Sequence, residues 1–228
     1  MILPPPGKQQ KIAAILSAYD DMIANNQRRI ALLESMAEEI YREWFVRMRF
    51  PGHANTPFNK GCPADWLPAT LNTICKFTMG QSPSSEFYNA VGNGLPFHQG
   101  VGTYGARFPM HEVFCSVPGR TAKAGDILFS VRAPVGRLNI ADQDLILGRG
   151  LASMRHVHGA NTYLYYLLKT TFSDEDMIGN GSIFKSVGKD ELERFPLISP
   201  PSALVNLFEE RVRPMDQQLN VLHRQVAS

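Results

Sequence analysis

The sequence has few cysteines and no long hydrophobic run. Its 228 residues include three cysteines, Cys62, Cys75 and Cys115, and no Cys-X-X-Cys pair. An odd count without such a pair argues against a disulfide framework and a zinc knuckle. No stretch approaches the roughly 18 consecutive apolar residues that a membrane-spanning helix needs, and the N-terminus has no apolar signal region. These absences predict a cytoplasmic chain with reduced thiols.

The signatures of catalytic and cofactor sites are missing too. The sequence has no glycine-rich phosphate loop, Gly-X-Ser-X-Gly elbow, His-Glu-X-X-His pair, Asn-Pro-Pro-Tyr-like tetrapeptide or Glu-X-Lys nuclease cluster. His156 and His158 could share one strand face, but without a third ligand nearby we interpret them as surface histidines. The acidic runs 174–176 and 190–193 are typical of solvated turns and helix starts. We therefore predict a chain without catalytic residues, metal or cofactor.

Net charge alone does not identify a partner. Lys and Arg number 23 against 21 for Asp and Glu, a formal charge of +2. Residues 107–155, however, hold seven basic and four acidic side chains, a local net charge of +3. A locally positive surface that suits DNA can therefore exist despite the nearly neutral total.

The first fifty residues predict a long helix. Residues 8–49 contain no Gly or Pro, and the helix should end at Phe50-Pro51-Gly52. Apolar residues follow a heptad pattern, with Asn26 at a position that can fix register. The residues expected to pair with another helix are Leu16, Tyr19, Ile23, Asn26, Ile30, Leu33, Ile40 and Trp44. At 1.5 Å per residue such a helix is about 60 Å long, so it needs a neighbour beyond its own domain.

The remaining chain divides into a strand-rich region and a second helix. Residues 51–201 are rich in Gly, Pro, Ser and β-branched residues, which predicts an α+β domain. Its expected elements are strands at 73–77, 126–131, 137–140 and 151–154 and a helix at 162–169, where Tyr163, Tyr165 and Tyr166 should pack rather than stack on bases. Helical periodicity returns at 202–228, with Phe208, Met215 and Leu222 on one line and Val212, Leu219 and Val226 on the next. Pro214 predicts a kink or break near Arg213.

Several segments resemble one protein family. The run QKIAAILSAYDDMI at 10–23, after the prolines at 4–6 and before Trp44 and Phe45, resembles the central spacer of type I restriction-modification specificity subunits. The next region carries further family features in the family's order. These are GQSPSSEFYN at 80–89, GLPFHQG at 94–100, AGDILFSVRAPVG at 124–136, GRGLASMR at 148–155 and GSIFKSVGKDELERFPL at 181–197.

The resemblance implies a spacer helix at 1–50, one target recognition domain at 51–201 and the start of a second spacer helix at 202–228. Leu204 and Val205 replace the family's usual Glu-Gln at the second Pro-Pro turn. The family also has two recognition domains, whereas this chain has one, so it looks like the second half of such a subunit. The family's function then implies a non-catalytic chain that reads half of a split double-stranded DNA target. It also implies docking to methyltransferase subunits and, through them, to restriction or translocase subunits.

The residues expected to touch DNA are polar side chains on glycine-rich loops and neighbouring cations. They are Gln81, Ser82, Ser84, Ser85, Gln99, Tyr104, Arg107, Arg120, Arg132 and Lys185. The serines could equally cap a neighbouring turn, and each cation could be a solvated surface charge.

Two other readings stay open at this point. The chain could be a truncated interaction protein that binds partners through its helices and has lost DNA recognition, or a fragment of an enzyme. We expect the long helix to pair with the C-terminal helix, either of this chain or of a second copy that replaces the missing half.

Overall fold

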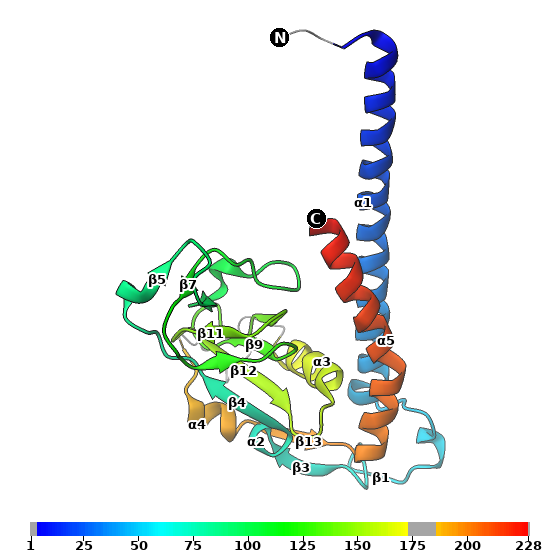
Figure 1. Cartoon of the computed structure of the whole chain (residues 1–228). Helices are drawn as coiled ribbons and strands as arrows, with labels where there is room; N and C mark the ends of the chain where they lie inside the picture. Colours follow the sequence, from blue (N-terminus) through cyan, green and yellow to red (C-terminus); the bar gives the residue numbers. More distant parts are fainter. Residues whose placement is uncertain (1–3, 173–185, 228) are drawn as a thin grey trace.

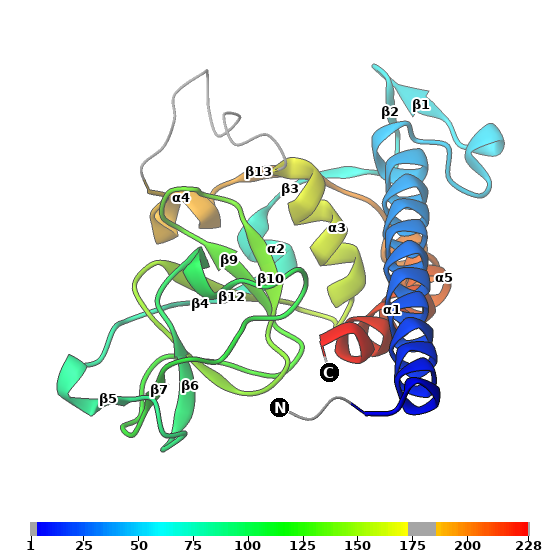
Figure 2. The same ribbon diagram turned by 90° about the horizontal axis from the view of Figure 1, so that it is seen from above.

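Two helices run side by side along one flank of a strand-rich domain. The computed structural model describes residues 4–172 and 186–227. Helix α1 (Pro6–Tyr41) stands as a long rod, and α5 (Ser202–Ala227) lies along its C-terminal part (Figure 1). Seen from above, the domain lies to one side of both helices, with α3 facing them (Figure 2). The predicted α+β architecture, one mixed domain between a long and a shorter helix, is confirmed.

Helix α1 is shorter than predicted. It starts with Pro6 in the first turn, where a missing N–H costs nothing. The α-helix ends at Tyr41 and continues as a π-helical turn at Arg42–Val46 rather than reaching Arg49. The backbone then reverses through Met48 and Gly52, which have φ angles of 57° and 90°. The widened turn buries the rings of Trp44 and Phe45 against the domain.

Helix α5 runs through Pro214 without a break. Pro214 is exposed, so its ring faces solvent. The neighbouring apolar side chains Phe208, Val212 and Leu219 are completely buried. Their packing stabilises the helix beyond what the lost hydrogen bond costs. Of the two alternatives predicted at this position, a break is therefore excluded.

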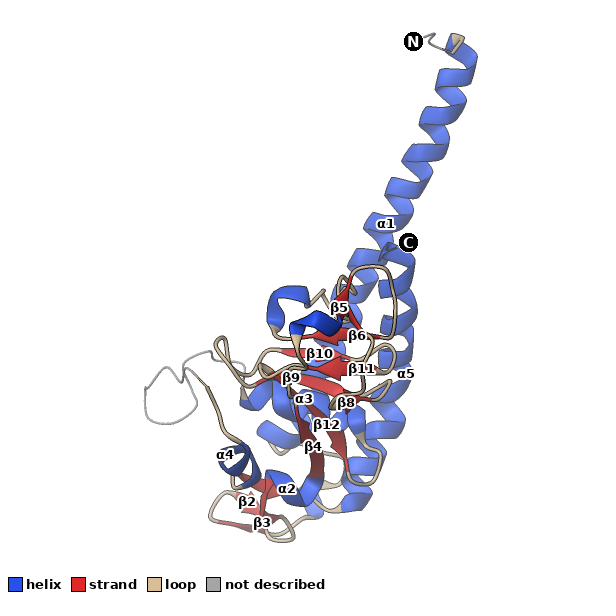
Figure 3. Ribbon diagram, turned by 60° about the vertical axis from the view of Figure 1, so that its left-hand side comes forward, coloured by secondary structure: helices blue, strands red, loops and turns tan. Residues whose placement is uncertain are grey.

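The domain is built on two main sheets, whose strands gather beside the helices (Figure 3). The antiparallel four-stranded sheet has the order β10-β9-β12-β4. Its strands are β4 (Cys75–Met79), β9 (Ile127–Ser130), β10 (Leu138–Ile140) and β12 (Leu151–His156). The five-stranded sheet has the order β5-β7-β6-β11-β8, in which β6 and β11 are parallel. Its strands are β5 (Tyr88–Asn89), β6 (Leu95–His98), β7 (Phe114–Cys115), β8 (Thr121–Ala122) and β11 (Leu145–Leu147).

Smaller elements complete the domain. Two strand pairs are β1 (Phe58–Asn59) with β2 (Cys62–Pro63) and β3 (Leu67–Thr70) with β13 (Pro196–Ser199). The short helices are α2 (Leu71–Ile74) and α4 (Lys189–Glu193). Single 3-10 turns lie at His53–Asn55, Ser85–Phe87 and Val101–Thr103. Three of the predicted strands match closely, while the strand predicted at 73–77 begins two residues later because α2 occupies the preceding turn.

Helix α3 (Asn161–Thr171) joins the sheet to the two long helices. Tyr163 and Tyr166 are 3% and 1% exposed, as expected of packing residues. Their rings meet those of Tyr41, Phe45 and Phe208, with centroids 5.0 Å apart for Phe45 and Tyr163. One aromatic cluster thus ties α1, α3 and α5 to the domain. Among the described residues, no helix is apolar over enough turns to cross a bilayer.

Candidate nucleic-acid interface

Three loops meet where strands of both sheets end. The loop at 80–82 follows β4, the loop at 99–100 follows β6, and the loop at 148–150 joins β11 to β12. The Gly148 amide donates to the His98 carbonyl at 2.8 Å, and the Gly150 amide donates to the Gln99 carbonyl at 3.0 Å. The Gln81 amide donates to the Leu147 carbonyl at 2.9 Å. Main-chain hydrogen bonds therefore hold all three loops in one unit, which we call the reading edge.

Close backbone approach explains the glycines in these loops. A Cβ atom on Gly80 would lie 2.1 Å from the Gly148 carbonyl oxygen. A Cβ on Gly148 would lie 2.7 Å from the Gln99 Cα, and one on Gly150 would lie 2.3 Å from the Gln99 carbonyl oxygen. Any side chain would push the loops apart.

The reading edge brings several predicted DNA-contacting residues together. Gln81, Gln99 and Arg120 are exposed, and Ser82 is half-buried. The Ser82 hydroxyl accepts a hydrogen bond from the Arg149 amide at 3.2 Å. Arg120 joins the edge because its carbonyl accepts the Leu147 amide at 2.7 Å. Residues that are far apart in sequence therefore present one polar, basic surface.

Arg132 lies beside this edge, and Ser84 and Ser85 follow it along the chain. The Val131 amide donates to the Gly150 carbonyl at 2.9 Å, so the exposed Arg132 follows directly. Ser84 and Ser85 are exposed at the start of a 3-10 turn, and the Phe87 amide donates to the Ser84 carbonyl at 3.2 Å. Lys185 lies outside the described residues.

A chain of hydrogen-bonded polar side chains begins at the buried His98, the last residue of β6, next to the reading edge. His98 Nδ1 lies 2.7 Å from the Thr103 hydroxyl, and His98 Nε2 lies 3.0 Å from His111 Nδ1. His111 Nε2 lies 3.1 Å from Asp142. Neutral rings satisfy the whole chain when Thr103 donates to His98, His98 to His111 and His111 to Asp142. Burial, together with the neighbouring His111, lowers the pKa of His98 to about 4, so its ring is neutral near pH 7.

Known proteins resemble this chain in sequence and in fold. A model of the type I restriction modification DNA specificity domain matches residues 63–204. The putative type I restriction enzyme MjaX specificity subunit of Methanocaldococcus jannaschii is 31% identical over 98% of this chain and 54% of its own length. The crystal structure of the HsdS subunit from Thermoanaerobacter tengcongensis is 30% identical, with a TM-score of 0.61 over 97% of this chain and 54% of that one. The chain belongs to the specificity-subunit family of type I restriction-modification systems.

A further structure shares the fold of this specificity-subunit chain. The S subunit of the type I system of M. genitalium is 15% identical, with a TM-score of 0.70 over 97% of this chain and 57% of the other. The chain therefore spans about half the length of the specificity subunits it matches.

Arg107, one of the predicted DNA contacts of this specificity subunit, is buried. Its side chain is 2% exposed and pairs with Asp216 of α5 at 3.0 Å. Arg107 Nε also donates to Asn220 at 2.8 Å, and the guanidinium lies over the Tyr165 ring. A buried, paired guanidinium does not fit the predicted contact with phosphate or guanine. The Arg107 side chain joins the strand-rich domain to helix α5 instead.

Tyr104 does not fit the predicted base contact either. Its ring packs against a buried cluster that includes Leu128, Leu147 and Leu151. Its hydroxyl is buried without a hydrogen-bond partner among the described residues. Burial raises the pKa of this hydroxyl well above its ordinary value. Tyr104 is half-buried, and its hydroxyl points into the domain and away from the surface where a base could accept or donate a hydrogen bond.

The residues predicted for helix pairing fall into two groups. Asn26, Ile30 and Trp44 are buried, and Ile23, Leu33 and Ile40 are half-buried. Their neighbours on α5 include Leu219 and Leu222, while Asn26 Nδ2 donates to Gln225 at 3.3 Å. Leu16 and Tyr19, in contrast, are 59% and 57% exposed. The C-terminal part of α1 thus pairs with α5 of this chain, and the N-terminal part of α1 extends beyond α5 (Figure 1).

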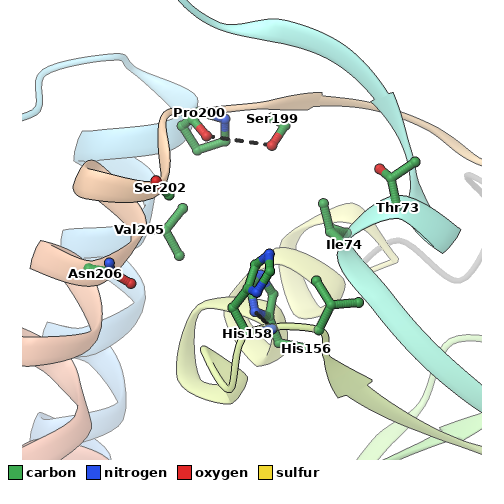
Figure 4. A pocket seen from close by; sticks show the side chains of 10 residues that line it. Thr73, Ile74, His156, His158, Ser199, Pro200, Ser202, Val205 and Asn206 are labelled. Carbon is green, nitrogen blue, oxygen red and sulfur yellow. Dashed lines mark hydrogen bonds between the residues drawn. The ribbon is translucent and has the colours of Figure 1, made fainter.

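A cavity of about 440 Å³ lies at the opposite end of β4 and β12 from the reading edge. Figure 4 shows His156 and His158 at the end of β12, with Val205 and Asn206 of α5 across the cavity. His158 is exposed, but His156 is 9% exposed, so the prediction of a surface residue is wrong for His156. Its Nδ1 accepts the Ala160 amide at 3.2 Å, and burial lowers its pKa to about 4. Among the described residues, no group of three His, Cys, Asp or Glu side chains is placed to hold a metal ion.

Arg149, which is not among the predicted DNA contacts, also lies at the reading edge. It is exposed at the reading edge between two glycines that cannot carry side chains. In the part of the chain that the structure describes, no ion pair involves Arg120, Arg132 or Arg149, whereas Lys123 and Arg155 pair with Asp144 and Asp126. The Gly-Arg-Gly sequence was the available signal, because it marks a cation on a tightly packed turn.

Proposed function

We propose that this chain reads one half of a split DNA target for a type I methyltransferase, and that catalysis resides on other subunits. The observation that carries the proposal is the reading edge itself. It places Gln81, Gln99, Arg120 and Arg149 on one surface, on loops fixed by main-chain hydrogen bonds. Rigid loops with exposed amide and guanidinium groups suit readout of base edges.

The side-chain chemistry assigns different roles along the edge. Glutamine can pair with adenine through two hydrogen bonds in the major groove, which suits Gln81 and Gln99. Arg120 and Arg132 suit phosphate contacts, which set affinity and orientation. Ser82 serves the scaffold through its bond to the Arg149 amide, and Ser84 and Ser85 extend the polar surface.

The test is DNA binding by the full chain together with its methyltransferase subunits. We expect sequence-selective binding that weakens steeply as salt rises, because phosphate contacts release counterions. The double variant Gln81→Ala/Gln99→Ala should lose selectivity. Gln143→Ala is the matched control, because Gln143 is also exposed but precedes β11 at the other end of the strands. Equal loss in both variants, or binding without sequence preference, would overturn the proposal.

A cellular experiment gives the target directly. Deleting the gene should remove one methylated DNA motif from the genome, and restoring it should bring the motif back. Restoring the double variant should not. An unchanged methylation pattern after deletion would instead support the alternative of an interaction protein that binds partner subunits through its helices without reading DNA.

We further propose that a second copy supplies the other half of the recognition unit. The exposed side chains Ile12, Ile15, Leu16 and Tyr19 form an apolar face where α1 extends past α5. Two copies related by a twofold axis can cover this face and present two recognition domains to a palindromic split target. Sedimentation should show a dimer at micromolar concentration, in the presence or absence of the methyltransferase. A monomer under both conditions would exclude it.

A further inference from the structure

Arg149 lies on a tightly held turn of the reading edge. It is the middle residue of the three that connect β11 to β12. The Gly148 amide donates to the carbonyl of His98 at the end of β6, and the Gly150 amide donates to Gln99 in the loop that follows, while the Arg149 amide donates to Ser82 in the loop after β4. Hydrogen bonds to two different loops therefore fix the backbone of Arg149.

The same contacts place Arg149 among side chains that can read bases. The space beside both flanking glycines is filled by Gln99, and the 80–82 loop carries Gln81. Tyr88 lies close enough for the Arg149 charge to act on its hydroxyl, which donates to the Pro83 carbonyl at 2.8 Å. The backbone of Arg149 thus lies beside the two loops that carry the neutral amide side chains Gln81 and Gln99.

The guanidinium is exposed and takes part in no ion pair among the described residues. Two other arginines of the domain have structural partners, Asp216 for Arg107 and Asp126 for Arg155. Arginine presents a planar pair of donors that matches the O6 and N7 acceptors of guanine, and this match requires a fixed backbone. A phosphate contact depends mainly on positive charge, which lysine also supplies, although as a point charge without the planar pair of donors.

We propose that Arg149 is a specificity-determining residue that reads a guanine in the DNA target through two hydrogen bonds from its guanidinium. This assignment rests on the proposed function, because it requires that the reading edge faces DNA. It predicts a G·C pair within the half-site that this domain recognises.

The experiment compares Arg149→Lys and Arg149→Gln with the wild-type chain, each assembled with its methyltransferase subunits. Binding is measured on the target and on duplexes with each base pair changed in turn, at several salt concentrations. Arg149→Lys keeps the positive charge but loses the planar pair of donors. We therefore expect discrimination against other base pairs at one G·C position to fall about 10- to 100-fold, with little change in the salt dependence of binding. Arg149→Gln should lose the same discrimination.

Arg194→Gln is the control variant. Arg194 is exposed in the same domain, next to α4, which contacts α2 at the far end of the sheet from the reading edge. It should leave selectivity unchanged. Equal melting temperatures of all four proteins show that the substitutions leave the fold intact.

Two results overturn the assignment in different ways. If Arg149→Lys keeps wild-type discrimination while Arg149→Gln lowers the salt slope by about one unit, Arg149 contacts phosphate. If both variants bind as the wild type does, Arg149 makes no DNA contact. In both cases the wild-type chain is still selective and the proposed function survives. A wild-type complex without sequence preference removes the proposed function and the Arg149 assignment together.

Discussion

The two ends of helix α1 carry the same kind of apolar repeat but have different surroundings. Toward the N-terminus, Ile12, Leu16 and Tyr19 are 49%, 59% and 57% exposed. Toward the C-terminus, Ile30, Ala37 and Tyr41 are at most 8% exposed. Helix α1 has 36 residues and α5 has 26, and Gln225 near the end of α5 faces Asn26. The repeat determines which face of α1 is apolar, whereas the extent of α5 determines where this chain covers it.

We call the C-terminal part of α1, which α5 covers, the covered end, and the N-terminal part the uncovered end. The largest expected effect on stability comes from removing the Phe208 ring, which packs against the covered end. Phe208 is completely buried and contacts the rings of Tyr41, Trp44 and Phe45. Phe208→Ala should lower the free energy of unfolding by about 4 kcal/mol, measured by chemical denaturation. Tyr19→Ala, at the uncovered end, should change it by less than about 0.5 kcal/mol. Similar losses in both variants would mean that both ends of α1 are packed in solution.

The next effect comes from the ion pair that joins the domain to α5. Arg107→Ala leaves Asp216 without its cation in a largely buried site, where the side chain of Asp216 is 12% exposed. We expect a loss of about 3 kcal/mol in the free energy of unfolding, by the same measurement. Arg120→Ala removes an exposed cation and should cost less than about 0.5 kcal/mol. A small effect of Arg107→Ala would show that the ion pair between Arg107 and Asp216 adds nothing to the free energy of unfolding.

Acid should lower the stability of the folded chain through two buried histidines, one next to the reading edge and one beside the start of α3. His98 and His156 have pKa values near 4 because both are buried, and His156 accepts an amide at the start of α3, on which α1 rests. In the unfolded chain histidine titrates near 6.5, so below that pH the unfolded state binds more protons and stability falls until about pH 4. From pH 7 to pH 5 each histidine should cost about 2 kcal/mol in the free energy of unfolding.

The measurement is denaturation of the wild type and of His98→Gln at several pH values. The variant should lose about half of the pH dependence between pH 7 and pH 5. The same pH dependence in both proteins would show that His98 does not stay neutral in the folded state.

The smallest effect concerns the uncovered end itself. Leu16→Ala should leave the unfolding free energy within about 0.5 kcal/mol of wild type in dilute solution, because Leu16 is 59% exposed. At higher concentration, a melting temperature that rises for the wild type but not for the variant indicates that a second copy covers this face. A large loss of unfolding free energy for Leu16→Ala in dilute solution would contradict the exposed position of Leu16.

Much of the fold was predictable, because helical and strand periodicity are local. The lines of apolar residues through Phe208 and Val212 on α5 became its buried face, and β9, β10, β12 and α3 lie where the pattern indicated them. The candidate site was predictable in part. Gln81 and Gln99 lie at the reading edge, but the hydroxyl of Tyr104 and the side chain of Arg107 proved to be buried. Their burial depends on partners such as Leu147 and Asp216, which no local pattern could identify.

By itself the sequence determined the order of helix, strand-rich domain and helix, the apolar face of each helix and the family. These follow from short-range periodicity and from motifs that are continuous in the chain. Only the tertiary structure decided that Arg107 fastens the domain to α5 and that Arg149 joins Gln81 and Gln99 on one surface. The physical reason is that an arginine side chain suits either a buried ion pair or an exposed contact, and what packs around it selects between them.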